Sequence, residues 1–295
     1  MKILSITGGK GGTGKSFVAT NIAYLMARKT NILLADLDVE APNDHILLGV
    51  KKLESEEPIK IFFPMIDYGK CTLCGACAKV CDTGAIIMSK GKPPIVMPRL
   101  CSGCKACMYA CVYDAIKPGE RVIGYTYIND VQIGQSSFKL LTGMLRYGEE
   151  HTAPAVRGAK TKAMKLAEKY GSLLMIDTGA GTGNSISIGI QFSDIVIAVT
   201  EPTPLGKHDL ESILKIVSGL GYKSWVVINR YGISDDKLIL EVSKDYGAEY
   251  IHKIPFHRDA VEAYTKGIPV PEYKPDSPVA KSLIELASMV ESEVL

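Results

Sequence analysis

MKILSITGGKGGTGKS, residues 1–16, is the stretch that decides the fold class of this 295-residue chain. The apolar residues 2–7 predict a buried strand, residues 8–14 a glycine-rich loop, and residues 17–28 have the apolar periodicity of a helix. Strand, loop and helix in this order are the context of a P-loop, and Gly9-x4-Gly14-Lys15-Ser16 fits its pattern. We therefore expect a phosphate to bind here, with Lys15 at the β- and γ-phosphates and the Ser16 hydroxyl on Mg²⁺.

The same letters fit a second motif. Gly9-x-Gly11-x-x-Gly14 is also a dinucleotide fingerprint, and Asp36 lies about 20 residues further on, where a ribose-binding acid would sit. The triplet Gly14-Lys15-Ser16 is required by a P-loop and unused by a dinucleotide fold. We therefore favour the P-loop over the dinucleotide motif and over an ordinary glycine-rich turn.

Further apolar runs predict the rest of the sheet. Residues 31–38, 173–177, 195–200 and 225–229 have the pattern of buried strands, and helical stretches at 154–170, 207–218, 235–246 and 279–294 alternate with them. This alternation predicts an α/β fold, a mostly parallel sheet with helices on both faces. Ligands bind at the carboxyl ends of such strands, where Gly9, Asp36, Asp177 and Asn229 fall.

All eight cysteines lie between Cys71 and Cys111, in two runs of the form C-x2-C-x2-C-x3-C. The second run begins 30 residues after the first, at Cys101, and both continue into an Ala-Ile pair, so the segment is an internal repeat. A chain that enters a strand without a charged-then-apolar leader is expected to be cytoplasmic, with reduced thiols available as ligands rather than disulfides. Zinc modules use cysteine pairs separated by a loop, without a third cysteine at this spacing.

The repeat resembles the bacterial two-cluster ferredoxin, which implies two [4Fe–4S] clusters and an exchange of the fourth ligand between the runs. By that resemblance one cluster takes Cys71, Cys74, Cys77 and Cys111, and the other takes Cys101, Cys104, Cys107 and Cys81. The proline that usually follows the fourth cysteine is replaced by Asp82 and Val112. The segment is also basic, and both an acidic redox partner and the charge of about −2 on each oxidised cluster would explain this.

The second lysine of the loop, Lys10, gives the motif a further resemblance. Gly-Lys-Gly-Gly-x-Gly-Lys-Ser is similar to the deviant Walker motif of the MinD/ParA/nitrogenase-iron-protein class of ATPases. The resemblance implies that Lys10 reaches the nucleotide of a partner subunit and that ATP closes a homodimer. An alternative for Lys10 alone is a solvated loop lysine. The nucleotide-binding backbone would be Gly9, Gly11, Gly12, Thr13, Gly14, Lys15 and Ser16.

Two acidic motifs extend this resemblance. Asp36-Leu37-Asp38 is similar to switch I, which implies that Asp38 is the catalytic carboxylate that positions water and that Asp36 lies nearer the metal. Asp177-Thr178-Gly179-Ala180-Gly181 is similar to switch II, with Asp177 as the Walker-B acid for Mg²⁺. Gly179 stands where the class has proline. Alone, each acid would be assigned to a helix cap or turn. Asn229 and Pro255 resemble the adenine-side positions.

The resemblance to the ATPase class covers about residues 1–50 and 120–295. It predicts an ATPase domain in two parts, 1–58 and 121–295, with an inserted ferredoxin domain at 59–120 and a linker at 51–58. MinD proteins attach to membranes by a basic C-terminal helix, whereas residues 279–294 carry Glu285, Glu291 and Glu293, so we expect no direct membrane anchor. A net charge of +2 gives no reason to expect nucleic-acid binding.

The combination predicts a slow ATPase that couples dimer switching to electron transfer through the two clusters, as in the nitrogenase iron protein. Its partners would be a second copy and a redox or iron–sulfur client protein. A second reading is an iron–sulfur assembly or carrier ATPase of the Mrp type, although the chain has no cysteine after Cys111 to form the C-terminal pair of that class. A third is a MinD-like regulatory ATPase whose clusters are structural or sense redox state.

Overall fold

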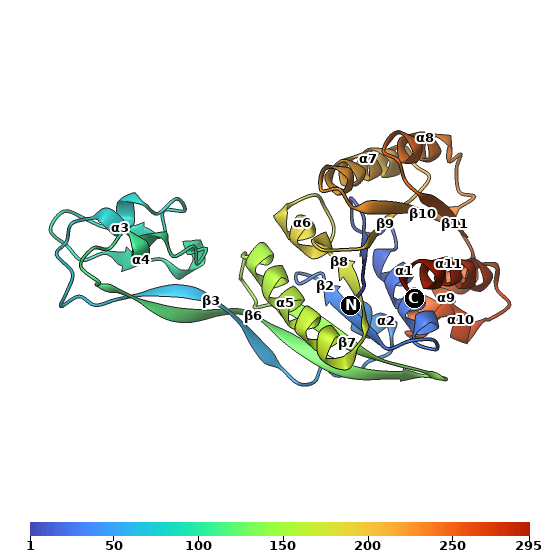
Figure 1. The fold of residues 1–295 in the computed structure, drawn as a ribbon, viewed down its shortest axis with the longest axis horizontal. Coiled ribbons are helices and arrows are strands. Elements are labelled where there is room, and N and C mark those ends of the chain that lie inside the picture. The colour runs from blue at the N-terminus through green and yellow to red at the C-terminus, as the bar shows by residue number, and fades with distance from the viewer.

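The structure, a computed structural model, describes residues 1–295 and contains a nine-stranded, mostly parallel sheet (Figure 1). In spatial order its strands are β11 (Tyr250–Pro255), β10 (Lys223–Tyr231), β9 (Ile195–Thr200), β1 (Ile3–Thr7), β8 (Leu173–Thr178), β2 (Ile32–Leu37), β7 (Ser136–Leu145), β6 (Ile116–Ile133) and β3 (Glu57–Ile66). All pairs are parallel except β7–β6 and β6–β3. The predicted α/β class is confirmed.

The central strands form where the sequence is continuously apolar. Every residue of β1, β2, β8 and β9 is buried, as expected for strands covered on both faces. One face packs on α1 (Lys15–Met26), α9 (Arg258–Lys266), α10 (Val270–Tyr273) and α11 (Pro278–Val294). The other packs on α5 (Thr152–Tyr170), α6 (Asn184–Ile190), α7 (Pro204–Gly219) and α8 (Lys237–Asp245).

Several predicted boundaries needed correction. The expected linker 51–58 is wrong at its end, because Glu57 and Pro58 already pair with β6. α5 begins at Thr152, two residues before the helical stretch expected at 154–170, and His151 occupies the cap position. α7 begins at Pro204 because the Thr203 side chain caps it, accepting a 3.0 Å hydrogen bond from the Gly206 N–H. α11 packs on the sheet, with Leu283, Leu286 and Val290 fully buried.

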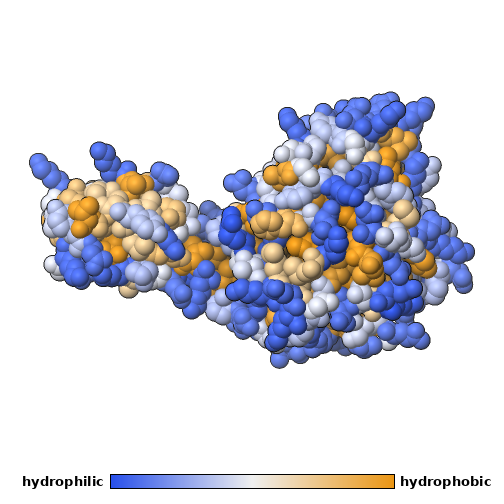
Figure 2. All heavy atoms as spheres, in the orientation of Figure 1, coloured by the Kyte–Doolittle hydropathy of each residue, from blue (hydrophilic) through white to orange (hydrophobic).

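β3 and β6 continue beyond the sheet as a two-stranded ribbon, and residues 67–115 form a small lobe at its far end (Figure 1). The lobe contains α3 (Ala76–Lys79), β4 (Ile86–Ile87), β5 (Ile95–Val96), the 3₁₀ turn Pro98–Leu100 and α4 (Ala106–Tyr109). Its buried core is small, centred on Ile86, Cys107 and Ile116. Figure 2 shows the narrow neck and the many apolar residues on the surface of the lobe. Two large side chains of the lobe, Tyr109 and Val112, are strongly exposed.

None of the helices combines the length with the apolar character needed to cross a bilayer.

Candidate functional site

The glycine loop between β1 and α1 passes close to two neighbouring segments, which only glycine allows. Gly12 and Gly14 have left-handed backbones, with φ of 87° and 97°. A Cβ on Gly14 would lie 2.2 Å from Asn229 Nδ2, and one on Gly9 would lie 2.4 Å from Asp209 Cβ. Asn229 in turn donates a 2.8 Å hydrogen bond to the Thr13 carbonyl, so the end of β10 holds the loop in shape.

The two lysines of the loop have different surroundings. Lys15 is buried, and its Nζ donates a 2.9 Å hydrogen bond to the Lys10 carbonyl inside the loop. Burial lowers the pKa of Lys15, while the nearby carboxylates of Asp177 and Asp38 act in the opposite direction. The Lys10 side chain is half-buried and has no ion-pair or hydrogen-bond partner among residues 1–295. Lys15 is therefore placed to meet a phosphate inside the loop, and Lys10 is free for a group outside it.

Three acids meet at the carboxyl ends of β2 and β8. Oxygens of Asp36, Asp44 and Asp177 lie within 4.8 Å of one another, and all three residues are buried. Ser16 Oγ donates a 2.6 Å hydrogen bond to Asp177 Oδ2. Burial raises the pKa of all three carboxyls, that of Asp177 to about 7, where the Ser16 hydroxyl and Lys15 act in the opposite direction. Such a group of carboxylate oxygens beside a P-loop serine fits Mg²⁺.

Asp36 also organises the segment that follows it. Its carboxylate accepts hydrogen bonds from the backbone N–H groups of Asp38 (3.1 Å), Asn43 (2.9 Å) and Asp44 (3.1 Å). The turn 38–44 is thus wrapped around one buried side chain, and it leads into the short helix α2 (Asp44–Leu47). Asp38 faces the segment 177–181, which resembles switch II: a Cβ at Gly179 would lie 3.3 Å from Asp38 Oδ1, so the glycine leaves room for this carboxylate.

A cavity of about 500 Å³ lies above the loop, a size typical of small-ligand sites. The cavity is lined by eight of the site residues expected from the sequence: Gly11, Gly12, Gly14, Lys15, Ser16, Asp38, Asn229 and Pro255. Gly9, Lys10, Thr13, Asp36 and Asp177 lie outside its lining. Phe17, Phe256, Val261 and Tyr264 add an apolar wall suited to the flat face of a base.

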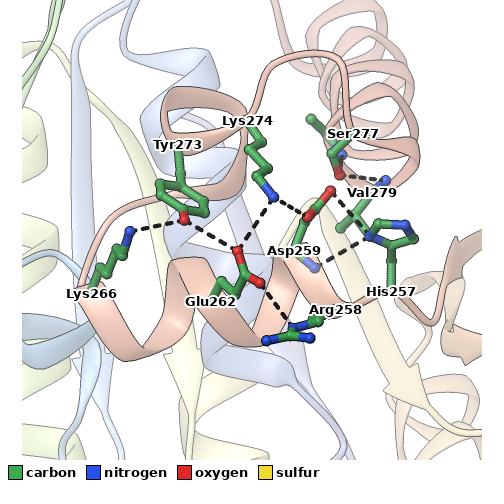
Figure 3. A network of polar contacts seen from close by, with 10 residues as sticks. His257, Arg258, Asp259, Glu262, Lys266, Tyr273, Lys274, Ser277 and Val279 are labelled. Carbon is green, nitrogen blue, oxygen red and sulfur yellow. Dashed lines mark hydrogen bonds and ion pairs between the residues drawn. The ribbon is translucent and has the colours of Figure 1, made fainter.

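Helix α9 supplies part of that wall and is held in place from its opposite side (Figure 3). Ala260, Val261 and Tyr264 face the cavity. On the other face, Lys274 Nζ lies 2.7 Å from Asp259 Oδ1 and 3.3 Å from Glu262 Oε2, which ties α9 to the segment before α11. The wall is therefore braced by a network that leaves its ligand-facing side apolar.

In the lobe, the cysteines gather in two groups that mix the two runs. Cys71, Cys74, Cys77 and Cys111 line one small cavity, together with Ile66, Met88 and Tyr113. Cys81, Cys101, Cys104 and Cys107 line the other, together with Phe62, Pro64 and Ile86. All eight thiols are free of disulfides. Four thiols around an apolar pocket are the donor set of a [4Fe–4S] cluster, so the residues present fit two such groups.

The repeat is visible in the backbone as well. Leu73, Gly75 and Gly84 have positive φ, and so do Gly103, Lys105 and Asp114, which stand 30 positions later. α3 and α4 begin directly after the second member of each set. The non-glycine residues Leu73, Lys105 and Asp114 accept an unfavourable conformation, which indicates that the loop path around the thiols is strongly imposed.

Sequence reasoning missed two features of the site. Asp44 was not singled out, because nothing in the sequence distinguishes it from an acidic residue at the start of a helix. The second feature is a polar cluster where the ribbon meets α5: Arg121 pairs with Glu149, Glu149 contacts His151, and Arg121 Nη2 lies 3.5 Å from the Cys101 carbonyl. Arg121 lies on β6 and the other two members lie just before α5, and the three share no motif.

Comparison with known proteins agrees with this geometry. The model of the CobQ/CobB/MinD/ParA nucleotide binding domain matches residues 4–270. The chain belongs to this family. Its CobQ/CobB/MinD/ParA relatives include an uncharacterized protein of Methanocaldococcus jannaschii that is 36% identical over 267 residues, or 90% of each chain. An iron-sulfur cluster carrier protein of Pyrococcus abyssi is 25% identical over 292 residues, covering 96% of this chain and 83% of the carrier.

Solved structures show the same fold. The septum site-determining protein MinD of Pyrococcus horikoshii, complexed with Mg-ADP, has a TM-score of 0.63 at 21% identity, covering 98% of this chain and 96% of that one. The cell division ATPase MinD of Pyrococcus furiosus gives 0.61 at 21% identity, covering 99% and 98%.

Proposed function

We propose that this member of the family is a MinD/ParA-type ATPase that couples ATP-dependent dimerisation to electron transfer through two [4Fe–4S] clusters. The ATPase would comprise residues 1–58 and 121–295, and the clusters would lie in an inserted ferredoxin-like domain, residues 59–120. The observation that carries the proposal is the sorting of the eight cysteines into two four-thiol pockets on a chain that also has a complete P-loop.

The nucleotide site supports hydrolysis by positioning and charge. Lys15 and the loop amides would bind the phosphates of ATP, and Ser16, Asp36 and Asp177 would hold Mg²⁺, which supplies the charge that neutralises the phosphates. Asp38, half-buried on the cavity wall, would orient and accept a proton from the attacking water. Lys10 would act across a homodimer, consistent with its unpaired side chain.

The cysteine lobe supports electron carriage. Bound clusters would supply one-electron redox chemistry, and the residues of the lobe tune it by burial and by hydrogen bonds to sulfur. Thr83 Oγ1 lies 3.6 Å from Cys81 Sγ. This hydroxyl and nearby backbone N–H groups outweigh the effect of burial and lower the pKa of the Cys81 thiol, which favours the thiolate that a metal requires.

Contacts at the base of the ribbon offer a route between the two parts. The Leu145 N–H donates a 2.7 Å hydrogen bond to the carbonyl of Val39 in switch I, and the Thr152 hydroxyl contacts Glu40. Arg121 then contacts both Glu149, just before α5, and the Cys101 carbonyl in the lobe, so it links the two. A ligand shifts a conformational equilibrium only by binding one state more tightly, and closure of switch I on ATP would provide that difference.

The decisive experiment uses anaerobically purified full-length protein. We expect about eight irons per chain, reduction by dithionite, and a potential or electron-delivery rate that differs between ATP and ADP. Stoichiometric zinc without sulfide would overturn the cluster assignment. Identical potentials and delivery rates in both nucleotides would overturn the coupling.

A second candidate function is cluster delivery, favoured by the similarity to the Pyrococcus carrier protein. The two functions differ in what leaves the protein. Incubation with the metal-free form of a [4Fe–4S] acceptor protein, in the presence of Mg-ATP, would strip iron from a carrier, whereas an electron-transfer protein would keep its eight irons.

A further inference from the structure

Asp44 is the most unusual polar side chain of the site. It is fully buried, and neither of its carboxylate oxygens accepts a hydrogen bond from a donor group; it lies against the carboxyl of Asp177, whose Oδ1 also lacks a donor. Its position is not accidental, because the Asp44 N–H is held at 3.1 Å by Asp36 Oδ2. The turn around Asp36 therefore places a second carboxylate without a donor group beside Asp177. A buried carboxylate without a donor or counter-ion is strongly unfavourable.

The charge balance around these acids is negative. Burial and the neighbouring acids Asp177 and Asp36 raise the pKa of Asp44, and Asp38 adds to this effect. Lys15 is the cation that acts on Asp177, and its Nζ is directed to the Lys10 carbonyl. Up to three carboxylates thus face one lysine, and the excess requires another cation or shared protons.

The spacing of the oxygens suits a metal ion. Opposing oxygen ligands stand about 4.2 Å apart around Mg²⁺ and about 4.8 Å apart around the larger Ca²⁺. The three acids present oxygens that all lie within 4.8 Å of one another, so they can converge on a single ion. Nucleotide-site Mg²⁺ is usually held by one or two carboxylates together with substrate phosphates, so three protein carboxylates make an unusually complete donor set.

We propose that Asp36, Asp44 and Asp177 bind one divalent cation, Mg²⁺ or Mn²⁺, in the absence of nucleotide. Asp44 is the additional metal ligand that makes this binding independent of phosphate. The inference deepens the proposed nucleotide site and rests on it for the role of the ion in hydrolysis. The binding itself needs no ATP, so it can fail or succeed separately from the ATPase.

The test is a Mn²⁺ titration of oxidised, nucleotide-free full-length protein, in which free Mn²⁺ is followed by electron paramagnetic resonance. We expect one Mn²⁺ per chain, displaced by Mg²⁺. Asp44→Asn should weaken binding at least tenfold, whereas Asp276→Asn, at an exposed acid without a hydrogen bond, should leave it unchanged. Wild-type protein that binds no Mn²⁺ at millimolar concentration overturns the proposal, whatever the ATPase activity.

Thermal unfolding gives a second readout. Mg²⁺ should raise the Tm of nucleotide-free wild type, because the ion relieves repulsion among the acids. Asp44→Asn should have a higher Tm than wild type without metal and lose most of the shift with it. An unchanged metal-free Tm together with a full Mg²⁺ shift in the variant would overturn the role of Asp44. If the variant does not fold, the wild-type titration alone decides.

Discussion

The hydroxyl of Ser16 donates a 2.6 Å hydrogen bond to the carboxylate of Asp177, joining the first turn of α1 to the end of β8. The two residues are 161 positions apart and come together because β1 and β8 are parallel neighbours, with Ile6 beside Asp177. The edge of the site that we propose binds Mg²⁺ is therefore assembled by the sheet itself.

Loss of this hydroxyl should weaken the metal-dependent part of nucleotide binding. Ser16→Ala removes one proposed Mg²⁺ ligand and one charge-assisted hydrogen bond, so Mg-ATP affinity should fall about tenfold or more. Calorimetry with and without Mg²⁺ checks this. ATP affinity without metal should change little, and Ser16→Thr, which keeps the hydroxyl, should resemble wild type. Equal losses with and without Mg²⁺ would contradict the assignment.

The two loop lysines should separate binding from closure. Lys15→Ala removes the buried cation at the phosphates, so ATP binding should be lost. Lys10→Ala should leave ATP binding to the monomer within about threefold of wild type and abolish hydrolysis and dimer formation. Nucleotide affinity and the mass of the ATP-bound species by light scattering distinguish them. If both variants lose binding equally, Lys10 does not act in trans.

The grouping of the cysteines predicts an unusual pattern of double variants. Cys81→Ser with Cys101→Ser damages a single pocket, so about four irons should remain. Cys81→Ser with Cys71→Ser damages both pockets and should leave almost none, although both cysteines belong to the first run. Iron and sulfide analysis after anaerobic reconstitution decides. Retention of four irons in the second pair would show that the runs do not exchange ligands.

Arg121 should carry part of the coupling between α5 and the lobe. Arg121→Met breaks its pairing with Glu149 and its contact to the Cys101 carbonyl. We expect full iron content and unchanged ATP affinity, but a smaller difference in cluster potential between ATP and ADP. Lys60→Met, which breaks the exposed ion pair with Glu120 on the same ribbon, is the matched control. An unchanged ATP–ADP difference in the Arg121 variant would exclude this route.

Lys160 gives a stability prediction with a pH dependence. Its Nζ donates to the carbonyls of Ile188 (2.9 Å), Gly189 (2.8 Å) and Gln191 at the end of α6. Lys160→Met should lower the free energy of unfolding by about 2 kcal/mol at pH 7, because the carbonyls lose their donor.

The pH dependence follows from burial, which lowers the pKa of Lys160 to about 8 from 10.5. Between those values the unfolded chain binds the proton that the folded chain has lost, so wild type gains stability relative to Lys160→Met as the pH rises from about 8 to 10.5. Chemical denaturation at pH 7, 8.5 and 10 measures this. If the difference in unfolding free energy between wild type and Lys160→Met shrinks over this pH range, the prediction is wrong.

Features carried by one continuous stretch could be predicted from the sequence. The P-loop strand and helix and the other strands predicted as buried each depend on neighbouring residues, and their types and order were correct. The two cysteine runs can also be recognised from the sequence, and the clusters they would bind stay a prediction. Features made by chain crossings could not. Asp44 becomes significant only because the turn around Asp36 brings it to β8, and Arg121 only because β6 runs past α5. The start of β3 at Glu57 was missed because its charged residues pair with β6 at the edge of the sheet, where no apolar alternation is required.

The ribbon has a mechanical consequence. Residues 116–122 of β6 pair only with β3, and the register shifts by one residue between Ile59 and Lys60, where Ile123 is the extra residue of a β-bulge. Bulges bend and twist a strand pair, so the base of the ribbon is a natural fulcrum. From there, residues 60–66 form an arm about 23 Å long, and a rotation of about 10° would swing its tip by about 4 Å. A small rotation where the ribbon leaves the main sheet would thus produce a displacement of several ångströms in the lobe.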